Sequence, residues 1–287
     1  MKRVPPKTTV RKAKPKKSAK KITSGKILKY SSLILLVAFL VAAVYQYRHG
    51  VLYYLGFKTN KRIESLTKEE RRIQDLRIYE ILARHKGKVY GIDVSHYQGR
   101  ILWDSLKQSK AEFPMQFVFI RATAGSDVAD TEYSRNWDGA KASGLIRGAY
   151  HYYRPDENSV KQAENFIKTV KLSKGDLPPV LDIEKIPAGQ SMDSLKSGLK
   201  RWLTKVEKHY GVKPVLYSGE SFYTDFLKEE FEGYNLWIAN YNFFEDEIHK
   251  EWLFWQFTDK ASVGGIEGPV DVNIYNGTIE DLKGMGK

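Results

Sequence analysis

From residue 89 onward, short runs of apolar, β-branched and aromatic residues recur along the chain. Eight of these runs predict strands, at 89–95, 117–123, 146–153, 179–184, 214–218, 236–241, 252–257 and 270–275. Segments long enough for helices separate the first six runs, at 102–110, 131–143, 157–172, 190–210 and 220–231. Only short connections, 242–251 and 258–269, follow. This alternation of strand and helix is typical of a parallel sheet with crossover helices.

Eight strands within residues 88–287 indicate an α/β fold that closes on itself. Because helices are expected after only the first five strands, we predict a modified TIM-like barrel of five βα units followed by three β strands. Catalytic groups of such barrels lie at the C-terminal ends of the strands. The strand ends are therefore the place to look for chemistry.

An uncharged run of 18 residues at 30–47 predicts a transmembrane helix. At 1.5 Å per residue it covers about 27 Å, close to the thickness of a bilayer core. Twelve basic residues precede it, which places the N-terminus in the cytoplasm. A cleaved signal peptide is the alternative, but its basic region is normally much shorter than 29 residues. We therefore expect a single-pass signal anchor that contacts membrane lipid, with everything after it outside the cytoplasmic membrane.

The segment 48–87 is expected to be a juxtamembrane stalk, helical over 65–85. The pattern leaves open whether this helix is a spacer or binds a partner, and a spacer is the simpler interpretation. The barrel domain is then expected to occupy 88–287.

The net charge of +13 belongs to the N-terminal tail. Residues 1–29 hold twelve of the 47 basic residues and no acid, so the rest of the chain is almost neutral against its 34 acids. Nucleic acid is therefore not an expected partner of the globular part. The absence of cysteine excludes disulfides and thiolate chemistry. The six histidines form no close pair, so we expect neither a metal nor a cofactor.

Two carboxylates, Asp182 and Glu184, end the fourth predicted strand in the sequence Pro-Val-Leu-Asp-Ile-Glu. Side chains alternate along a strand, so these two lie on one face, and Leu181 and Ile183 face the opposite way. Two neighbouring acids at the end of a buried strand cannot both ionise easily, so one should keep its proton to a higher pH. That is the property of a general acid. The alternative for an isolated pair is one helix cap and one solvated acid.

The other strand ends supply further acids and a set of aromatic residues. Asp93 ends the first strand and Asp271 lies in the last. The aromatic candidates for substrate binding are Tyr150, Tyr152, Tyr217, Trp237, Tyr241 and Trp255. Acids surrounded by aromatic rings suit a sugar, because the rings stack on its C–H faces and the acids act on its hydroxyls and glycosidic oxygen.

The same residues carry a family resemblance. In order, the chain contains G-I-D-V-S-H-Y-Q-G (91–99), F-I-R-A-T-A-G (119–125), G-A-Y-H-Y-Y (148–153), P-V-L-D-I-E (179–184), L-Y-S-G (216–219), L-W-I-A-N-Y (236–241), W-Q-F (255–257) and G-P-V-D-V-N (268–273). From about 89 to 276 it resembles the lysozymes of glycoside hydrolase family 25. The resemblance implies cleavage of the β-1,4 bond between N-acetylmuramic acid and N-acetylglucosamine in peptidoglycan.

Position by position, the resemblance implies that Glu184 is the proton donor and Asp182 its partner. Asp93 and Asp271 match the family's acids on the first and last strands, and we assign them to charge tuning and substrate positioning. One departure is Ala124, where many members carry a glutamate. We interpret it as a change at the rim of the site, since all four central acids are present.

Three mechanisms remain open: a carboxylate nucleophile, an inverting base, and attack by the substrate's own 2-acetamido group oriented by Asp182. We favour the third, because the D-x-E pair resembles that arrangement in other glycosidases. Two other functions also remain open. One is a catalytically silent, membrane-tethered glycan-binding protein, and the other is a glycosidase that acts on a chitin-type polymer.

Overall fold

The computed structural model describes residues 24–47, 67–108 and 112–286 of the chain. The chain divides into two compact units, 1–48 and 49–287. Most of the predicted basic tail and the first part of the predicted stalk, 48–66, lie outside the described residues. The first unit contributes helix α1 (Ser24–Gln46), which includes nearly all of the apolar run.

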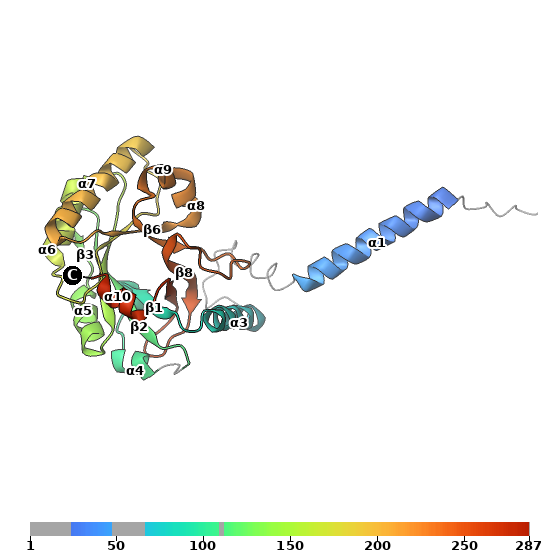
Figure 1. Ribbon diagram of the computed structural model, residues 1–287, viewed down its shortest axis with the longest axis horizontal. Coiled ribbons are helices and arrows are strands. Elements are labelled where there is room, and N and C mark those ends of the chain that lie inside the picture. The colour runs from blue at the N-terminus through green and yellow to red at the C-terminus, as the bar shows by residue number, and fades with distance from the viewer. Residues whose placement is uncertain (1–23, 48–66, 109–111, 287) are drawn as a thin grey trace, which may run out of the picture. The chain divides into compact units, whose positions relative to one another are not determined.

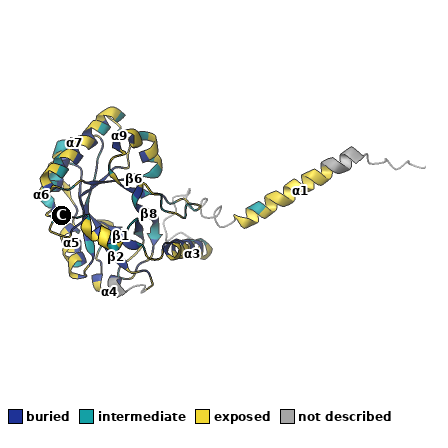
Figure 2. Ribbon diagram, in the orientation of Figure 1, coloured by how far each residue is buried: buried dark blue, intermediate teal, exposed yellow. Residues whose placement is uncertain are grey.

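The predicted transmembrane segment is not supported by this structure. Among the described residues, no helix combines the length and the apolar character needed to cross a bilayer. The apolar side chains of α1 from residue 30 onward are largely exposed, as Figure 2 shows.

The second unit is a closed barrel of eight strands (Figure 1). In spatial order its strands are β1 (Val89–Val94), β9 (Val270–Tyr275), β8 (Trp252–Ala261), β7 (Asn235–Ala239), β6 (Val215–Gly219), β5 (Val180–Asp182), β4 (Ile146–Tyr152) and β2 (Met115–Ala124). Pairing of β1 with β2 closes the ring. The two-residue strand β3 (Val128–Ala129) adds a hairpin to β2.

The helices follow the predicted five-plus-three pattern. The first three units carry η2 (His96–Gln98) with α4 (Trp103–Gln108), α5 (Tyr133–Ala142) and α6 (Ser159–Thr169). The fourth carries α7 (Met192–Tyr210), and the fifth carries α8 (Glu220–Phe222), η3 (Tyr223–Leu227) and α9 (Lys228–Phe231). The short helix α10 (Ile279–Gly284) follows β9. The coarse fold predicted from the sequence, an eight-stranded α/β barrel, is therefore confirmed.

The last strand differs from a simple parallel barrel. β9 pairs antiparallel with both of its neighbours, β1 and β8, whereas the other pairings between barrel strands are parallel. The beginning of β9, and not its end, therefore lies beside the C-terminal ends of the other strands. Asp271 still reaches the catalytic end of the barrel, because it is the second residue of β9 and pairs in register with Asp93.

Aromatic rings fill the barrel below its catalytic end. Phe119 stacks on Trp237 with ring centroids 4.5 Å apart, and Phe117 contacts Phe254 at 5.4 Å. Glycine on a neighbouring strand makes this packing possible, because a Cβ at Gly91 would lie only 2.5 Å from the Phe117 ring. Side chains therefore fill the interior, as they do in other eight-stranded barrels.

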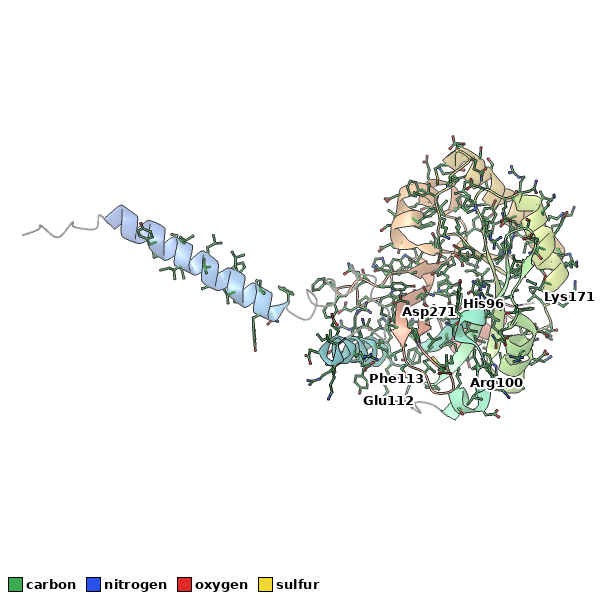
Figure 3. The ribbon with its side chains drawn as sticks, turned by 180° about the vertical axis from the view of Figure 1, so that it is seen from behind. His96, Arg100, Glu112, Phe113, Lys171 and Asp271 are labelled. Atoms are coloured by element: carbon green, nitrogen blue, oxygen red, sulfur yellow. The ribbon has the colours of Figure 1, made fainter. Side chains whose placement is uncertain are left out.

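Helix α3 (Lys68–Arg84) packs on the barrel and is not a free-standing stalk. Thr67 and Glu70 form a capping box at its start, and its buried residues include Ile78 and Ile81. It lies against β8, one of the three strands that lack a following crossover helix. A ring contact of 5.6 Å between Tyr79 and Phe113 continues this interface, and Figure 3 shows Phe113 beside the helix. The described part of the barrel domain therefore begins at Thr67, well before residue 88.

Candidate active site

The catalytic end of the barrel contains a cavity of about 320 Å³. All four acids proposed from the sequence line it, and Asp271 is labelled in Figure 3. The lining residues are Asp93, Val94, Ser95, Tyr97, Gln98, Arg121, Tyr150, Tyr152, Asp182, Glu184, Tyr217, Trp237, Tyr241, Gln256, Asp259 and Asp271. Strand ends from around the ring thus contribute to one acidic, aromatic pocket.

Asp182 and Glu184 lie on the same side of the chain at the end of β5. Both line the cavity, whereas Leu181 and Ile183 between and beside them are fully buried in the layer under the helices. β5 itself is shorter than predicted, ending at Asp182. The alternation continues one step further because the Ile183 amide donates to the Tyr217 carbonyl at 3.1 Å.

The two acids differ in their surroundings. Asp182 is 6 % exposed, and its Oδ1 atom is buried without a hydrogen-bond partner. Burial, and then the charges of Glu184 and Asp93, raise the pKa of Asp182 well above its usual value. Glu184 is open at the cavity mouth but has protein on its other sides, and this partial burial raises its pKa as well. The neighbouring Tyr217 hydroxyl and the charge of Lys185 oppose the rise in the Glu184 pKa. Two acids that resist ionisation therefore stand side by side.

Asp93 is held by two side-chain amides. Gln256 and Asn273 donate to its Oδ2 atom at 2.7 and 2.8 Å. Each amide is oriented in turn: Tyr217 donates to Gln256 Oε1 at 2.8 Å, and Trp237 donates to Asn273 Oδ1 at 2.8 Å. Because these donors occupy the amide oxygens, the amide NH₂ groups must face Asp93.

Burial raises the pKa of Asp93 to about 6, although the hydrogen bonds from Asn273 and Gln256 oppose the rise. The charge of Glu184 adds to it. Sequence reasoning placed Gln256 and Asn273 at strand ends but gave them no role. The available signal was strand alternation: Gln256 lies two residues after Phe254 on β8, and Asn273 lies two residues after Asp271 on β9, so each faces the barrel interior.

A fifth acid, Asp259, also lines the cavity and was missed from the sequence. Its strand was predicted to end at 257, but β8 continues to Ala261 through irregular pairing with β9. Burial raises the pKa of Asp259, and its Oδ1 atom has no hydrogen-bond partner. Burial also raises the pKa of Asp271 well above its usual value, with the charges of Asp93 and Asp259 adding to the effect.

Five of the six predicted aromatic contacts line the cavity. Tyr152, Asp182, Tyr217 and Trp237 form one row across β4, β5, β6 and β7, each in register with the next. Trp237 is only 2 % exposed, so it forms part of the cavity floor.

Trp255 does not belong to the cavity, which corrects the prediction made for it. It is fully buried on the other face of β8 from Gln256, and its indole N–H donates to the Asn240 carbonyl at 3.0 Å. Its ring lies 5.8 Å from that of His85, the residue that ends α3. Alternation along β8 places residue 256 toward the cavity and therefore turns residue 255 outward.

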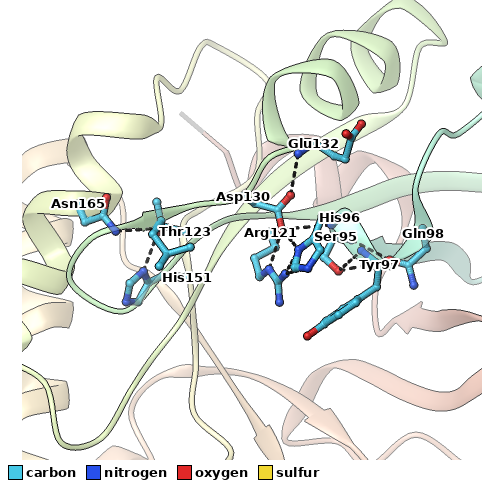
Figure 4. A network of polar contacts seen from close by, with 11 residues as sticks. Ser95, His96, Tyr97, Gln98, Arg121, Thr123, Asp130, Glu132, His151 and Asn165 are labelled. Atoms are coloured by element: carbon cyan, nitrogen blue, oxygen red, sulfur yellow. Dashed lines mark hydrogen bonds and ion pairs between the residues drawn. The ribbon is translucent and has the colours of Figure 1, made fainter.

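A polar cluster at the rim holds the one cationic side chain among the described residues that line the cavity (Figure 4). Asp130, whose side chain is 1 % exposed, accepts from Arg121 Nε at 2.8 Å and contacts His96 Nδ1 at 2.9 Å. The Arg121 guanidinium also lies 5.1 Å from the centre of the Tyr97 ring. The position of this cation beside Asp182 lowers the pKa of that acid, in opposition to burial.

His151, in contrast, lies outside the cavity. It is fully buried between Thr123 Oγ1, 2.7 Å from its Nδ1, and Gln162 Oε1, 3.0 Å from its Nε2. Burial lowers its pKa to about 4, so it is a neutral structural residue at ordinary pH.

Comparison with known proteins places this geometry in a family. The model of glycosyl hydrolases family 25 matches residues 92–266, more than half of the chain. The chain belongs to glycosyl hydrolase family 25. It is therefore an enzyme of the glycoside hydrolase class, and the matched region contains Asp93, Asp182 and Glu184 but ends before Asp271.

Individual proteins are similar to this chain over about two thirds of its length. An uncharacterized protein, YegX, of Escherichia coli K12 is 42 % identical over 197 residues, 68 % of this chain and 72 % of YegX. Lysozyme M1 of Streptomyces globisporus is 33 % identical over 210 residues, 68 % of this chain and 70 % of that protein. A solved family 25 glycosyl hydrolase from Bacillus anthracis superposes with a TM-score of 0.62 at 31 % identity, covering 70 % of this chain and 94 % of that one.

Proposed function

We propose that the protein hydrolyses the β-1,4 bond between N-acetylmuramic acid and N-acetylglucosamine in peptidoglycan. The observation that carries the proposal is the pair Asp182 and Glu184 in one cavity, with a buried and unpaired oxygen on Asp182. Membership of family 25 and similarity to a protein named lysozyme M1 support peptidoglycan as the substrate.

Glu184 is the general acid of this proposal. It lies at the open side of the cavity, where a glycosidic oxygen can approach, and partial burial raises its pKa, which favours the protonated form that a general acid needs. It donates that proton to the leaving oxygen as the C1–O bond breaks, and later removes a proton from the water that completes hydrolysis.

Asp182 acts on the nucleophile of the proposed reaction, the 2-acetamido group of the substrate. The 2-acetamido carbonyl oxygen of the substrate attacks C1, which forms a cyclic oxazolinium and gives the acetamido nitrogen a positive charge. The unpaired Oδ1 atom of Asp182 accepts the N–H of that group, and Arg121 nearby favours the ionised form of Asp182. Asp93 and Asp271, which line the same cavity, tune the charge of the site and position the substrate.

Substitution of the proposed acid tests the mechanism. Glu184→Gln keeps the shape of the side chain and should lower turnover on purified peptidoglycan by about 10²- to 10⁴-fold. The matched control is Glu267→Gln, an exposed acid outside the cavity lining, which should cleave like the unchanged protein. Near-normal turnover of Glu184→Gln would show that another group is the acid.

Analysis of the products and of alternative substrates identifies the bond that is cleaved and the nucleophile. New reducing ends should be N-acetylmuramic acid, and a chitin polymer should be a much poorer substrate. Reducing ends of N-acetylglucosamine, or equal cleavage of chitin, would contradict the proposed bond. De-N-acetylated glycan should resist cleavage if the acetamido group is the nucleophile, and efficient cleavage of it would instead indicate a carboxylate or water.

The location of the enzyme is proposed from the sequence. Peptidoglycan lies outside the cytoplasmic membrane, and a basic tail followed by an apolar run of 18 residues favours an N-terminus in the cytoplasm and a barrel on the outer side. Protease treatment of intact spheroplasts tests this arrangement. Digestion of the barrel is expected, and full protection would contradict it.

A further inference from the structure

Arg77 is a buried cation on helix α3, outside the region matched by the family model. It is 4 % exposed. A buried guanidinium is costly unless its N–H groups are well paired, so its position must be fixed by the groups around it. Those groups lie on the β7–β8 loop and on β8, far from Arg77 in sequence.

Three backbone carbonyls accept hydrogen bonds from Arg77. Nη1 donates to Phe257 O at 2.9 Å, and Nη2 donates to Asn242 O at 2.7 Å and to Glu245 O at 3.3 Å. One planar group therefore joins the β7–β8 loop to β8, beyond the last backbone pairing between these strands at Asn240 and Gln256.

The carbonyls that Arg77 holds are next to two residues of the cavity. Asn242 follows Tyr241 and Phe257 follows Gln256 in the chain. The hydroxyl of Tyr241 donates to Gln256 Oε1, and Gln256 Nε2 donates to Asp93 Oδ2 at 2.7 Å. The guanidinium thus fixes, from outside the barrel, the backbone that carries both members of this hydrogen bond.

We infer that α3 is part of the catalytic unit and that Arg77 is a positioning residue, which holds Tyr241 and Gln256 against Asp93 by joining the β7–β8 loop to β8. The helix covers strands that have no crossover helix after them, and its Ile78 and Ile81 anchor it in the core. A helix that precedes the first barrel strand therefore determines the geometry of the cavity. The inference rests on the proposed function only for the choice of substrate.

The test is a double-mutant cycle in the full chain. Arg77→Ala and Tyr241→Phe should each lower kcat on peptidoglycan, by about 10- to 100-fold for Arg77→Ala, since a shift of about 1 Å in a catalytic arrangement has effects of this size. The double variant should be no slower than the slower single variant, because both changes loosen the same contact. Arg77→Lys keeps the charge but cannot reach three carbonyls at once, so it should recover only part of the rate.

The control is Arg72→Ala on the exposed side of the same helix, which should leave kcat and KM unchanged. A purely structural role predicts instead a lower Tm with normal kcat well below the Tm, or losses that multiply in the double variant, and either result overturns the inference. If Arg77→Ala does not fold, the same cycle with Arg77→Lys gives the decision.

A substrate-independent readout separates this inference from the proposed function. Amide hydrogen exchange in 240–245 and 256–257 should become faster in Arg77→Ala or Arg77→Lys than in Arg72→Ala. Unchanged exchange there would overturn the inference whatever the substrate. An unchanged chain that fails to cleave peptidoglycan would refute the proposed function alone.

Discussion

Replacing Asp93 by asparagine should stabilise the fold in a way that depends on pH. Burial raises the pKa of Asp93 from 3.8 to about 6, a shift of about two units. Each unit corresponds to about 1.4 kcal/mol, so the folded state is less stable by about 3 kcal/mol at pH 7 than it would be with a neutral group there. Asparagine is neutral, has the same shape, and can still accept from Gln256 and Asn273.

The direction in which stability changes with pH follows from proton binding. Between about pH 4 and pH 6 the folded protein holds the Asp93 proton and the unfolded chain has lost it, so this group makes stability fall as pH rises through that window. Above pH 6 the whole cost is present, and below pH 4 it is absent. Other acids of the cavity contribute in the same direction, since the charge of Asp93 also raises the pKa values of Asp182 and Asp271.

Urea unfolding of the unchanged chain and of Asp93→Asn at pH 4 and pH 7 measures the effect. The difference in free energy of unfolding between the two proteins should increase by about 3 kcal/mol in favour of the variant from pH 4 to pH 7. Comparing the change between two pH values removes any constant effect of the substitution on packing. A difference that is the same at both pH values would refute the reasoning that Asp93 is a destabilising buried charge.

Three further substitutions test other parts of the structure. Gly265→Ala should lower stability by about 1–3 kcal/mol in thermal unfolding, because φ is +90° and the new Cβ would lie 2.4 Å from a backbone oxygen, whereas Gly219→Ala should have little effect. Equal Tm values for these two variants would contradict this. Arg147→Met leaves Asp176 buried without the cation 2.7 Å away and should cost about 3–5 kcal/mol, with much of the loss recovered when Asp176→Leu is added. Failure of the second change to restore any stability in urea unfolding would count against this reading. Trp255→Phe should lower the Tm but leave KM for peptidoglycan unchanged. A raised KM would indicate that Trp255 contacts the substrate after all.

The alternation of side chains was enough to predict that Asp182 and Glu184 lie on one face, because β5 is buried and short. The same rule predicts that Trp255 faces outward once Gln256 faces the cavity. Trp255 was expected at the sugar cleft but does not line the cavity, because aromatic character was given more weight than strand parity. An aromatic residue at a strand end can pack under a helix as readily as it can face a ligand.

Asp259 and Arg77 could not be found from the same patterns. β8 continues past the apolar run 252–257 through two register shifts, and irregular pairing leaves no period in the sequence. The pattern of 65–85 predicted a helix, which the structure contains at Lys68–Arg84, but it did not identify the surface that the helix covers. A helix expected to be a spacer proved to be packed on the barrel, because the last three strands have no helices of their own.

Reversal of the final strand determines where the chain enters and leaves the barrel. The first residue of β1, Val89, pairs with the last residue of β9, Tyr275, and Lys88 Nζ donates to Asn276 Oδ1 at 3.1 Å. Entry and exit are therefore neighbours at the end opposite the catalytic cavity. A reporter attached at this end of the barrel, after helix α10, should leave the approach of a long glycan strand unobstructed.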